Sequence, residues 1–186
     1  MMRVVALETL VMLGLTAILA FIIITGHSHD RYFAETGNGK SMQMLSLPYP
    51  NMGRAAVSDW VAGAISQVMT FGFNDVDQRF AASRHLFTAA GWKSFNTALS
   101  NSSFVSDVMK TQQIVTSVPE SVPILRQEGL IDGAYSWVFD MPLLVTFRAG
   151  ANIKRIVANV RVVVHRVSPQ DNPRALGISS WYISSG

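Results

Sequence analysis

The sequence predicts an α+β protein: one membrane-spanning helix, followed by a domain in which helices pack on one face of a curved antiparallel sheet. Three observations predict this fold class. Residues 4–25 are almost entirely apolar. Apolar residues then recur every three or four positions through residues 52–110, which is typical of helices, and alternate with polar residues from residue 112 onward, which is typical of strands. Because the helices come first and the strands afterwards, the order favours an antiparallel meander.

The apolar segment is long enough to cross a bilayer. From Val4 to Thr25 the only charged residue is Glu8, and about 22 residues extend about 33 Å as a helix. The run exceeds the apolar part of a cleaved signal peptide, and no cleavage site of small residues follows it. We therefore expect a retained anchor, with Arg3 favouring a cytoplasmic N-terminus and the domain outside the cytoplasm. A cleaved leader on a secreted chaperone is the alternative.

Four residues of this segment are candidates for helix packing in the membrane: Glu8, Gly14, Ala17 and Ala20. A carboxylate costs free energy inside lipid, so Glu8 either reaches back to the interface or contacts a neighbouring helix. The three small residues would let a second helix approach closely.

A linker, residues 26–51, contains Gly and Pro and is expected to include one short extended piece. The first helix of the domain is expected over residues 52–72, with Asn51 as its N-cap and Gly72 at its end. Asp59 falls opposite the apolar stripe of this helix, where a carboxylate stays hydrated. The stripe consists of Val57, Trp60, Val61, Ala64, Ile65, Val68 and Met69.

Three shorter helices follow. Asn74 caps the first of them, and Asp75 and Asp77 then lie in its first turn, where the helix dipole favours acids. Asp75 can also pair with Arg79 four residues further on. The second begins after Thr88, and the third is the stretch NSSFVSDVMK. The apolar side of the second is formed by Trp92, Phe95 and Leu99.

Five strands are expected in the second half of the chain. Asp132 and Gly133 lie between two of them and form one of the strongest short signals of a β-hairpin. Pro142 interrupts the third strand, where the missing amide donor predicts a bulge or an unpaired point. In the fourth strand, a polar face that includes Arg161 and His165 alternates with valines. The expected strands span residues 112–118, 123–131, 134–148, 153–167 and 178–184.

A tightly packed interior is expected where the apolar faces of these helices and strands meet. Large apolar side chains at periodic positions are more often part of a core than of a binding site. The predicted core comprises Trp60, Ile65, Val68, Trp92, Phe95, Trp137 and Phe139.

The sequence predicts no catalytic, cofactor-binding or metal-binding residue. Asp59, Asp75 and Asp77 near His85 fit helix caps and hydrated faces better than a catalytic cluster, and the two histidines of GHSHD are a weak metal signal in a linker. The chain lacks the motifs of phosphate-binding loops, serine hydrolases and zinc proteases, and it contains no Cys. Its net charge of +3 is scattered, so direct nucleic-acid binding is not expected.

Four stretches occur in a specific order: AAVSDWVAGAISQVMTFGF, FTAAGWKSF, FDMPLLVTF and NPRALGIS. Over about Tyr32 to Ile183 the chain resembles the DotI/IcmL/TraM family, inner-membrane components of type IVB secretion systems and of related conjugative plasmids. The resemblance implies a nuclear-transport-factor-like cone, with a long helix and shorter helices on a curved four-stranded antiparallel sheet. It divides the chain into a cytoplasmic tip, a transmembrane helix, a linker and a periplasmic cone: residues 1–3, 4–25, 26–51 and 52–186.

The resemblance implies assembly without catalysis. The expected role is a structural subunit of the bacterial inner membrane that self-associates and docks other subunits of the machine, including a short anchor-only paralogue, with membrane lipid around its anchor. No cofactor is implied. The alternative is a membrane-tethered enzyme or small-ligand-binding module, which predicts an open polar pocket lined by residues such as Tyr135 or Asp140. A pocket filled by Trp60, Trp92 and Phe139 would argue against it.

Overall fold

The structure is a computed structural model that describes Met12, Gly14, Thr16 and residues 32–35, 41–44 and 47–185. Contacts within the chain divide it into two units, Met1–Ser46 and Leu47–Gly186. The second unit is called the domain below.

The first unit contains a two-stranded antiparallel sheet of β1 (Tyr32–Glu35) and β2 (Ser41–Met44), where the sequence predicted a single extended piece. The predicted membrane helix, residues 4–25, lies outside the described residues except for three helical positions near its middle. Among the residues that are described, no helix is both long and apolar enough to cross a membrane.

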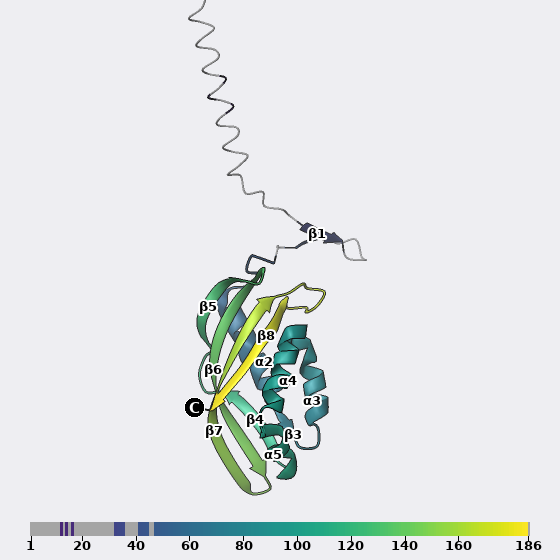
Figure 1. The fold of residues 1–186 in the computed structure, drawn as a ribbon, viewed down its shortest axis with the longest axis vertical. Coiled ribbons are helices and arrows are strands. Elements are labelled where there is room, and N and C mark those ends of the chain that lie inside the picture. Colours follow the sequence, from purple (N-terminus) through teal and green to yellow (C-terminus); the bar gives the residue numbers. More distant parts are fainter. Residues whose placement is uncertain are drawn as a thin grey trace, which may run out of the picture. The chain divides into compact units, whose positions relative to one another are not determined.

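The helices of the domain lie against one face of its sheet (Figure 1). They are α2 (Arg54–Val68), α3 (Val76–Ser83), the 3-10 helix η1 (Arg84–Leu86), α4 (Ala89–Ser100) and α5 (Phe104–Lys110). The boundaries predicted for α2 are wrong at both ends. Gly53, not Asn51, occupies the N-cap, and the helix ends at Val68 because Phe71 and Gly72 pair with a strand.

One face of α2 enters the core. Val57, Val61, Ile65 and Val68 are each 1% exposed or less, as expected for apolar side chains at spacings of three and four. Asp59 is exposed, on the side predicted from the sequence.

The start of α3 differs by one residue from the prediction, because Asp75 and not Asn74 occupies the N-cap. Asp75 Oδ1 accepts a hydrogen bond from the Gly72 amide at 2.7 Å, and Oδ2 accepts one from Arg79 Nε at 2.9 Å. The bond from Gly72 and then the bond from Arg79 lower the pKa of Asp75. The predicted pair with Arg79 is thus confirmed, and Asp77 lies in the first turn as predicted.

The sheet of the domain is antiparallel and has six strands in the part of the chain that the structure describes, whereas five were expected from the residue pattern and four from the family resemblance. Its order is β3-β4-β6-β7-β8, and β5 pairs with β6 beyond the end of β4. The strand that the residue pattern missed is β3, which is only two residues long. Strand β6 is long enough to pair with β4 and β5 in succession on one side. The strands are β3 (Phe71–Gly72), β4 (Ile114–Pro119), β5 (Ile124–Ile131), β6 (Ala134–Ala149), β7 (Asn152–Arg166) and β8 (Leu176–Ser185).

The predicted hairpin between β5 and β6 is confirmed. Ile131 pairs with Ala134, so the turn has two residues, Asp132 and Gly133. Their φ angles are 51° and 80°, and positive values at both positions are what a type I′ turn requires.

Pro142 causes no bulge in β6, which pairs through it with Asn159 of β7 in unbroken register. The carbonyl of Pro142 accepts a hydrogen bond from the Glu120 amide at 3.0 Å. The amide and carbonyl of a strand residue point to the same side of the strand. The missing amide of Pro142 therefore faces the gap along β6 between its pairing with β4 and its pairing with β5. The prediction of an unpaired point is therefore confirmed, and that of a bulge is wrong.

The core contains an aromatic cluster centred on Phe95. The ring centroid of Phe95 lies 5.2 Å from those of Phe80 and Phe87, 5.6 Å from that of Trp92 and 5.3 Å from that of Trp181. These separations are in the range of favourable aromatic contacts. The cluster joins α3, α4 and β8.

The residues assigned to the core from the sequence fall into two groups. The structure buries Ile65, Val68, Phe95, Trp137 and Phe139. Trp60 and Trp92 are only partly buried and pack against the core from its margin. The Arg84 guanidinium lies 5.5 Å from the ring centroid of Trp92, as in a cation–π contact at the surface.

The free edge of β8, the last strand of the sheet, is covered by α4. Thr88 Oγ1 caps the helix by accepting from the Gly91 amide at 3.0 Å, and the Thr88 amide donates to the Ile178 carbonyl at 2.9 Å. Ser94 Oγ donates to the Trp181 carbonyl at 3.2 Å and accepts from its amide at 3.1 Å. The helix thus satisfies backbone groups that an edge strand would otherwise present to solvent.

Replacing Gly91 by Ala should lower the free energy of unfolding by about 3 kcal/mol, because the new methyl group must displace backbone. A Cβ at this position would lie 1.8 Å from the Ile178 carbonyl oxygen. The matched control is Gly63→Ala on α2, where nothing lies within 4 Å of the added carbon. It should raise stability by about 0.5–1 kcal/mol through helix propensity. Urea unfolding followed by circular dichroism measures both, and equal effects would contradict the close approach of α4 to β8.

Candidate functional site

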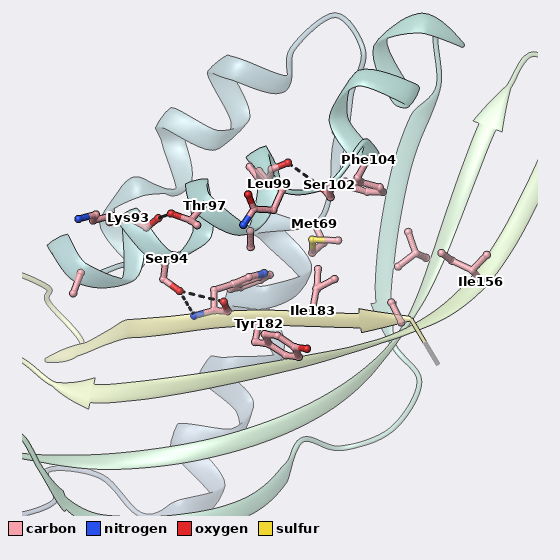
Figure 2. Close-up of a pocket in the computed structure, with 16 residues that line it drawn as sticks. Met69, Lys93, Ser94, Thr97, Leu99, Ser102, Phe104, Ile156, Tyr182 and Ile183 are labelled. Carbon is pink, nitrogen blue, oxygen red and sulfur yellow. Dashed lines mark hydrogen bonds between the residues drawn. The ribbon is translucent and has the colours of Figure 1, made fainter.

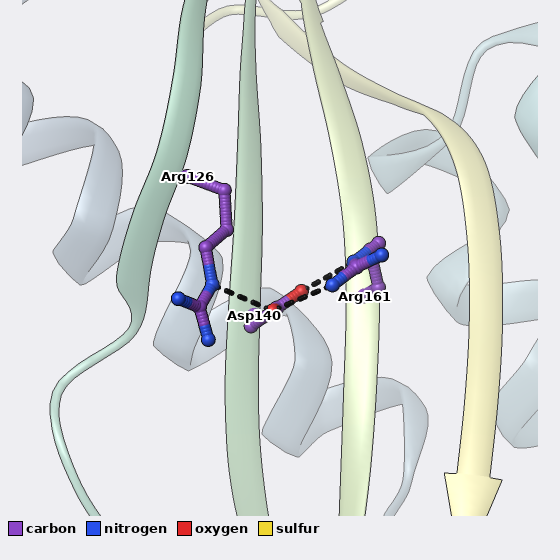
Figure 3. Close-up of polar contacts among 3 residues, drawn as sticks. All are labelled: Arg126, Asp140 and Arg161. Atoms are coloured by element: carbon purple, nitrogen blue, oxygen red, sulfur yellow. Dashed lines mark hydrogen bonds and ion pairs between the residues drawn. The ribbon is translucent and has the colours of Figure 1, made fainter.

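One face of the sheet carries no helix within residues 47–185, and we call it the outer face. Figure 3 views this face, with the helices behind the strands. Because successive side chains of a strand alternate between faces, cross-strand partners share a face. The exposed or half-exposed side chains of the outer face include Thr116, Val118, Ile124, Asp140, Leu144, Val157, Arg161 and Tyr182.

The centre of the outer face is an ion-pair network in which one carboxylate serves two guanidinium groups. Arg161 donates from Nε to Asp140 Oδ1 at 2.6 Å and from Nη2 to Oδ2 at 2.8 Å, and Arg126 Nε donates to Oδ2 at 2.8 Å (Figure 3). The bonds from Arg161 and then from Arg126 lower the pKa of Asp140 to about 2, against the opposing effect of burial. The network carries a net positive charge and holds it in a fixed place.

Strand register and a bulge bring these three residues together. Asp140 lies directly opposite Arg161 in the pairing of β6 with β7. On the other side, the register shifts between Leu125 and Gln127, so Arg126 has no cross-strand partner and reaches Asp140 instead.

Apolar residues flank the network. Val118, Leu144 and Val157 lie side by side across β4, β6 and β7, and Val118 and Val157 are 54% and 41% exposed. Ile124 of β5, opposite Asp140, is also exposed. Exposed apolar side chains gathered around ordered charges are typical of protein–protein interfaces.

A second feature is a groove of about 750 Å³ between α4 and the sheet, which we call the α4 groove (Figure 2). Its apolar lining includes Met69, Leu99, Phe104, Ile156, Trp181 and Ile183. Two of its hydroxyl groups bond to backbone carbonyls nearby: Thr97 Oγ1 donates to the Lys93 carbonyl at 2.9 Å, and Ser102 Oγ to the Leu99 carbonyl at 3.0 Å. No carboxylate or histidine is among its lining residues.

The α4 groove does not have the polar lining expected of an enzyme or small-ligand module. Asp140 lies on the outer face and is held by two arginines, and the Tyr135 ring packs 5.0 Å from that of Trp137. Neither lines the groove. Phe139 is buried in the core.

Of the acids considered near His85, Asp59 lines the same cavity of about 610 Å³ as His85, whereas Asp75 and Asp77 do not line it. His85 Nδ1 donates to the Ala82 carbonyl at 2.8 Å, and His165 is half-buried, which lowers its pKa. Within the described residues there is no group of three or more metal-ligating side chains. Of the residues considered for packing in the membrane, only Gly14 is described. Glu8, Ala17 and Ala20, and the histidines of GHSHD, lie outside the described residues.

Sequence reasoning missed the network around Asp140. Alternation placed Asp140 and Arg161 on polar faces of their strands, but pairing them required the register of β6 against β7. Counting residues outward along β6 and β7 from the two-residue loop that joins them could have given that register. No sequence signal marks the bulge at Arg126.

The model of the type IVb secretion system inner-membrane complex component, DotI/IcmL, matches residues 5–185. Comparison with functionally curated proteins found no match.

Three solved structures are similar to the domain. The periplasmic domain of DotI is 31% identical, with a TM-score of 0.71 over 74% of this chain and 99% of that one. An IcmL-like type IV secretion system protein from Legionella pneumophila is 23% identical, with a TM-score of 0.65 over 74% of this chain and 96% of that one. A periplasmic fragment of TraM is 16% identical, with a TM-score of 0.66 over 72% of this chain and 98% of that one. The last two show the shared fold alone. The chain belongs to the DotI/IcmL family of type IVb secretion system inner-membrane components.

Proposed function

We propose that this chain is a non-catalytic structural subunit of the inner-membrane complex of a type IVB secretion or conjugative transfer machine, and that it acts by self-association and by docking other subunits. Membership of the DotI/IcmL family supports the assignment to the machine. The outer face is the observation that supports the mode of action.

The outer face is suited to docking for two reasons. Its apolar residues, among them Val118 and Val157, would lose contact with water in an interface, which is the main favourable term in association. The arginines of the network are already held by Asp140, so less side-chain entropy is lost when a partner binds.

The proposed topology is that of a bitopic protein. Residues 1–3 lie in the cytoplasm, residues 4–25 span the inner membrane, residues 26–51 form a linker, and residues 52–186 form the periplasmic cone. The likeness to the periplasmic domain of DotI supports the location of the domain. Glu8, Gly14, Ala17 and Ala20 would then contact lipid or a second anchor helix, from another copy or from a short anchor-only paralogue.

Cysteine cross-linking tests the docking role, because the natural chain contains no Cys and each variant has a single thiol. Val118→Cys and Val157→Cys on the outer face should form disulfide-linked dimers, or adducts with another subunit, when membranes of cells that carry the machine are oxidised. Denaturing electrophoresis without reductant detects them.

The matched control is Asp59→Cys, an exposed position on α2 away from the outer face. It should remain uncross-linked under the same oxidation. Cross-linking at Asp59→Cys alone, or only monomers for both outer-face variants, would contradict docking through this face.

Protease access tests the topology. Proteinase K added to spheroplasts should digest the domain, because a periplasmic domain is accessible once the outer membrane is opened. A cytoplasmic protein followed in the same samples should stay intact. A domain that is digested only after the inner membrane is lysed would reverse the proposed orientation.

Asp140→Asn should lower the free energy of unfolding by about 1–2 kcal/mol at neutral pH, because the two guanidinium groups lose their common anion. The folded-state pKa of about 2 lies below the usual value for Asp. The contribution of Asp140 is therefore complete above about pH 4 and is lost as the pH falls toward 2. Urea unfolding of both proteins between pH 7 and pH 2 checks this. Asp59→Asn, which removes an exposed acid without an ion pair among the described residues, should change stability by less than about 0.5 kcal/mol.

A further inference from the structure

One strand edge of the domain is left open next to the α4 groove. β7 pairs with β6 from Asn152 onward, but β8 pairs with β7 only from Ala158 onward. Within the described residues, no strand pairs with residues 152–157 on that side. Unlike β8, whose edge is closed by α4, this part of β7 has no described strand beside it to take its backbone hydrogen bonds.

The backbone groups that face the open side can be assigned from the known hydrogen bonds. Trp181 of β8 bonds through its amide and carbonyl to a side chain of α4, so these groups point away from β7. Its cross-strand partner Val162 must therefore bond to β6. Since strand residues alternate, Ile153, Arg155 and Val157 direct their amides and carbonyls toward the open side.

Apolar side chains accompany this edge. Ile156 lies at one end of the α4 groove, near Phe104, as Figure 2 shows. Ile153 and Val157, on the other face of β7, are 49% and 41% exposed. A strand added beside β7 would cover side chains on both faces, because its own side chains would also alternate.

Four cations lie around the edge. Arg148, Lys154 and Arg155 lie at the end of the hairpin of β6 and β7, and Lys93 lies at the other end of the α4 groove (Figure 2). None of the four forms an ion pair with a described residue. Two copies of this edge would therefore repel each other, whereas an acidic segment would be attracted.

We propose that the open edge of β7, at Ile153, Arg155 and Val157, accepts an extended segment of another protein as an added strand, and that this segment alternates acidic with apolar residues. Backbone hydrogen bonds give this mode of binding its affinity, and the groove and the cations select the side chains. The inference names one docking mode and thus rests on the proposed docking function. The site is separate from the outer-face residues chosen for cross-linking, except for Val157.

The experiment measures fluorescence anisotropy of a short labelled peptide in which glutamate alternates with valine, titrated with the full chain in mild detergent. Lys154→Glu should weaken binding at least about ten-fold, because it reverses a charge beside the edge. Arg174→Glu makes the same charge change near the other end of β7, in the loop before β8, and should have little effect.

Two variants of Arg155 separate the contribution of its charge to peptide binding from that of its backbone amide. Arg155→Ala removes the guanidinium but keeps the amide donor, whereas Arg155→Pro removes both without breaking a bond to β6. Arg155→Pro should bind the peptide at least about ten-fold more weakly than Arg155→Ala. On the unchanged protein, a peptide with alternate amides N-methylated should lose binding to the same degree, which keeps the test valid if Arg155→Pro does not fold.

Equal binding of the methylated peptide, or binding unaffected by Lys154→Glu, would overturn the strand site. Competition by phosphatidylglycerol vesicles but not by unlabelled peptide would assign the edge to an anionic membrane instead. Release of monomers from a dimer by the peptide, seen by light scattering, would assign it to a second copy. If the strand site fails while Val118→Cys still cross-links, the proposed docking function stands without it.

Discussion

The long antiparallel pairing of β6 with β7 is the constraint on which the rest of the domain depends. It runs without a register shift from Ser136 opposite His165 to Ala149 opposite Asn152. Because side chains alternate along a strand, this one register decides which residues enter the core and which face solvent. A slip of one residue would turn Trp137 outward and Asp140 inward, where its charge would cost several kcal/mol without its arginines.

The same pairing produces both candidate interaction surfaces. On the outer face it sets Asp140 beside Arg161 and Leu144 beside Val157, so that fixed charges adjoin exposed apolar side chains. At the far end of the hairpin it carries β7 beyond the last residue of β8 with which it pairs, and leaves an edge next to the α4 groove.

Local signals predicted much of the fold from the sequence. Asp132-Gly133 marked the hairpin because only a few residues tolerate positive φ, and the ion pair of Asp75 with Arg79 followed from helix geometry alone. The failures involve partners that are distant in the chain. The end of α2 is set by pairing of Phe71 with Val115, and the network at Asp140 needs a bulge in another strand. Periodicity describes one segment at a time and carries no information about such partners.

Pro142 has an effect that extends beyond its own position. It stands where β4 ends and before β5 begins, so the side of β6 that faces them is covered by two short strands of six and eight residues and not by one long one. A continuous outer strand as long as β6 would offer an unbroken row of free amides to any passing chain, which is the usual starting point for aggregation. By withholding one amide, Pro142 removes a hydrogen bond that a single continuous strand beside β6 would need, and so disfavours such a strand on this flank of the sheet.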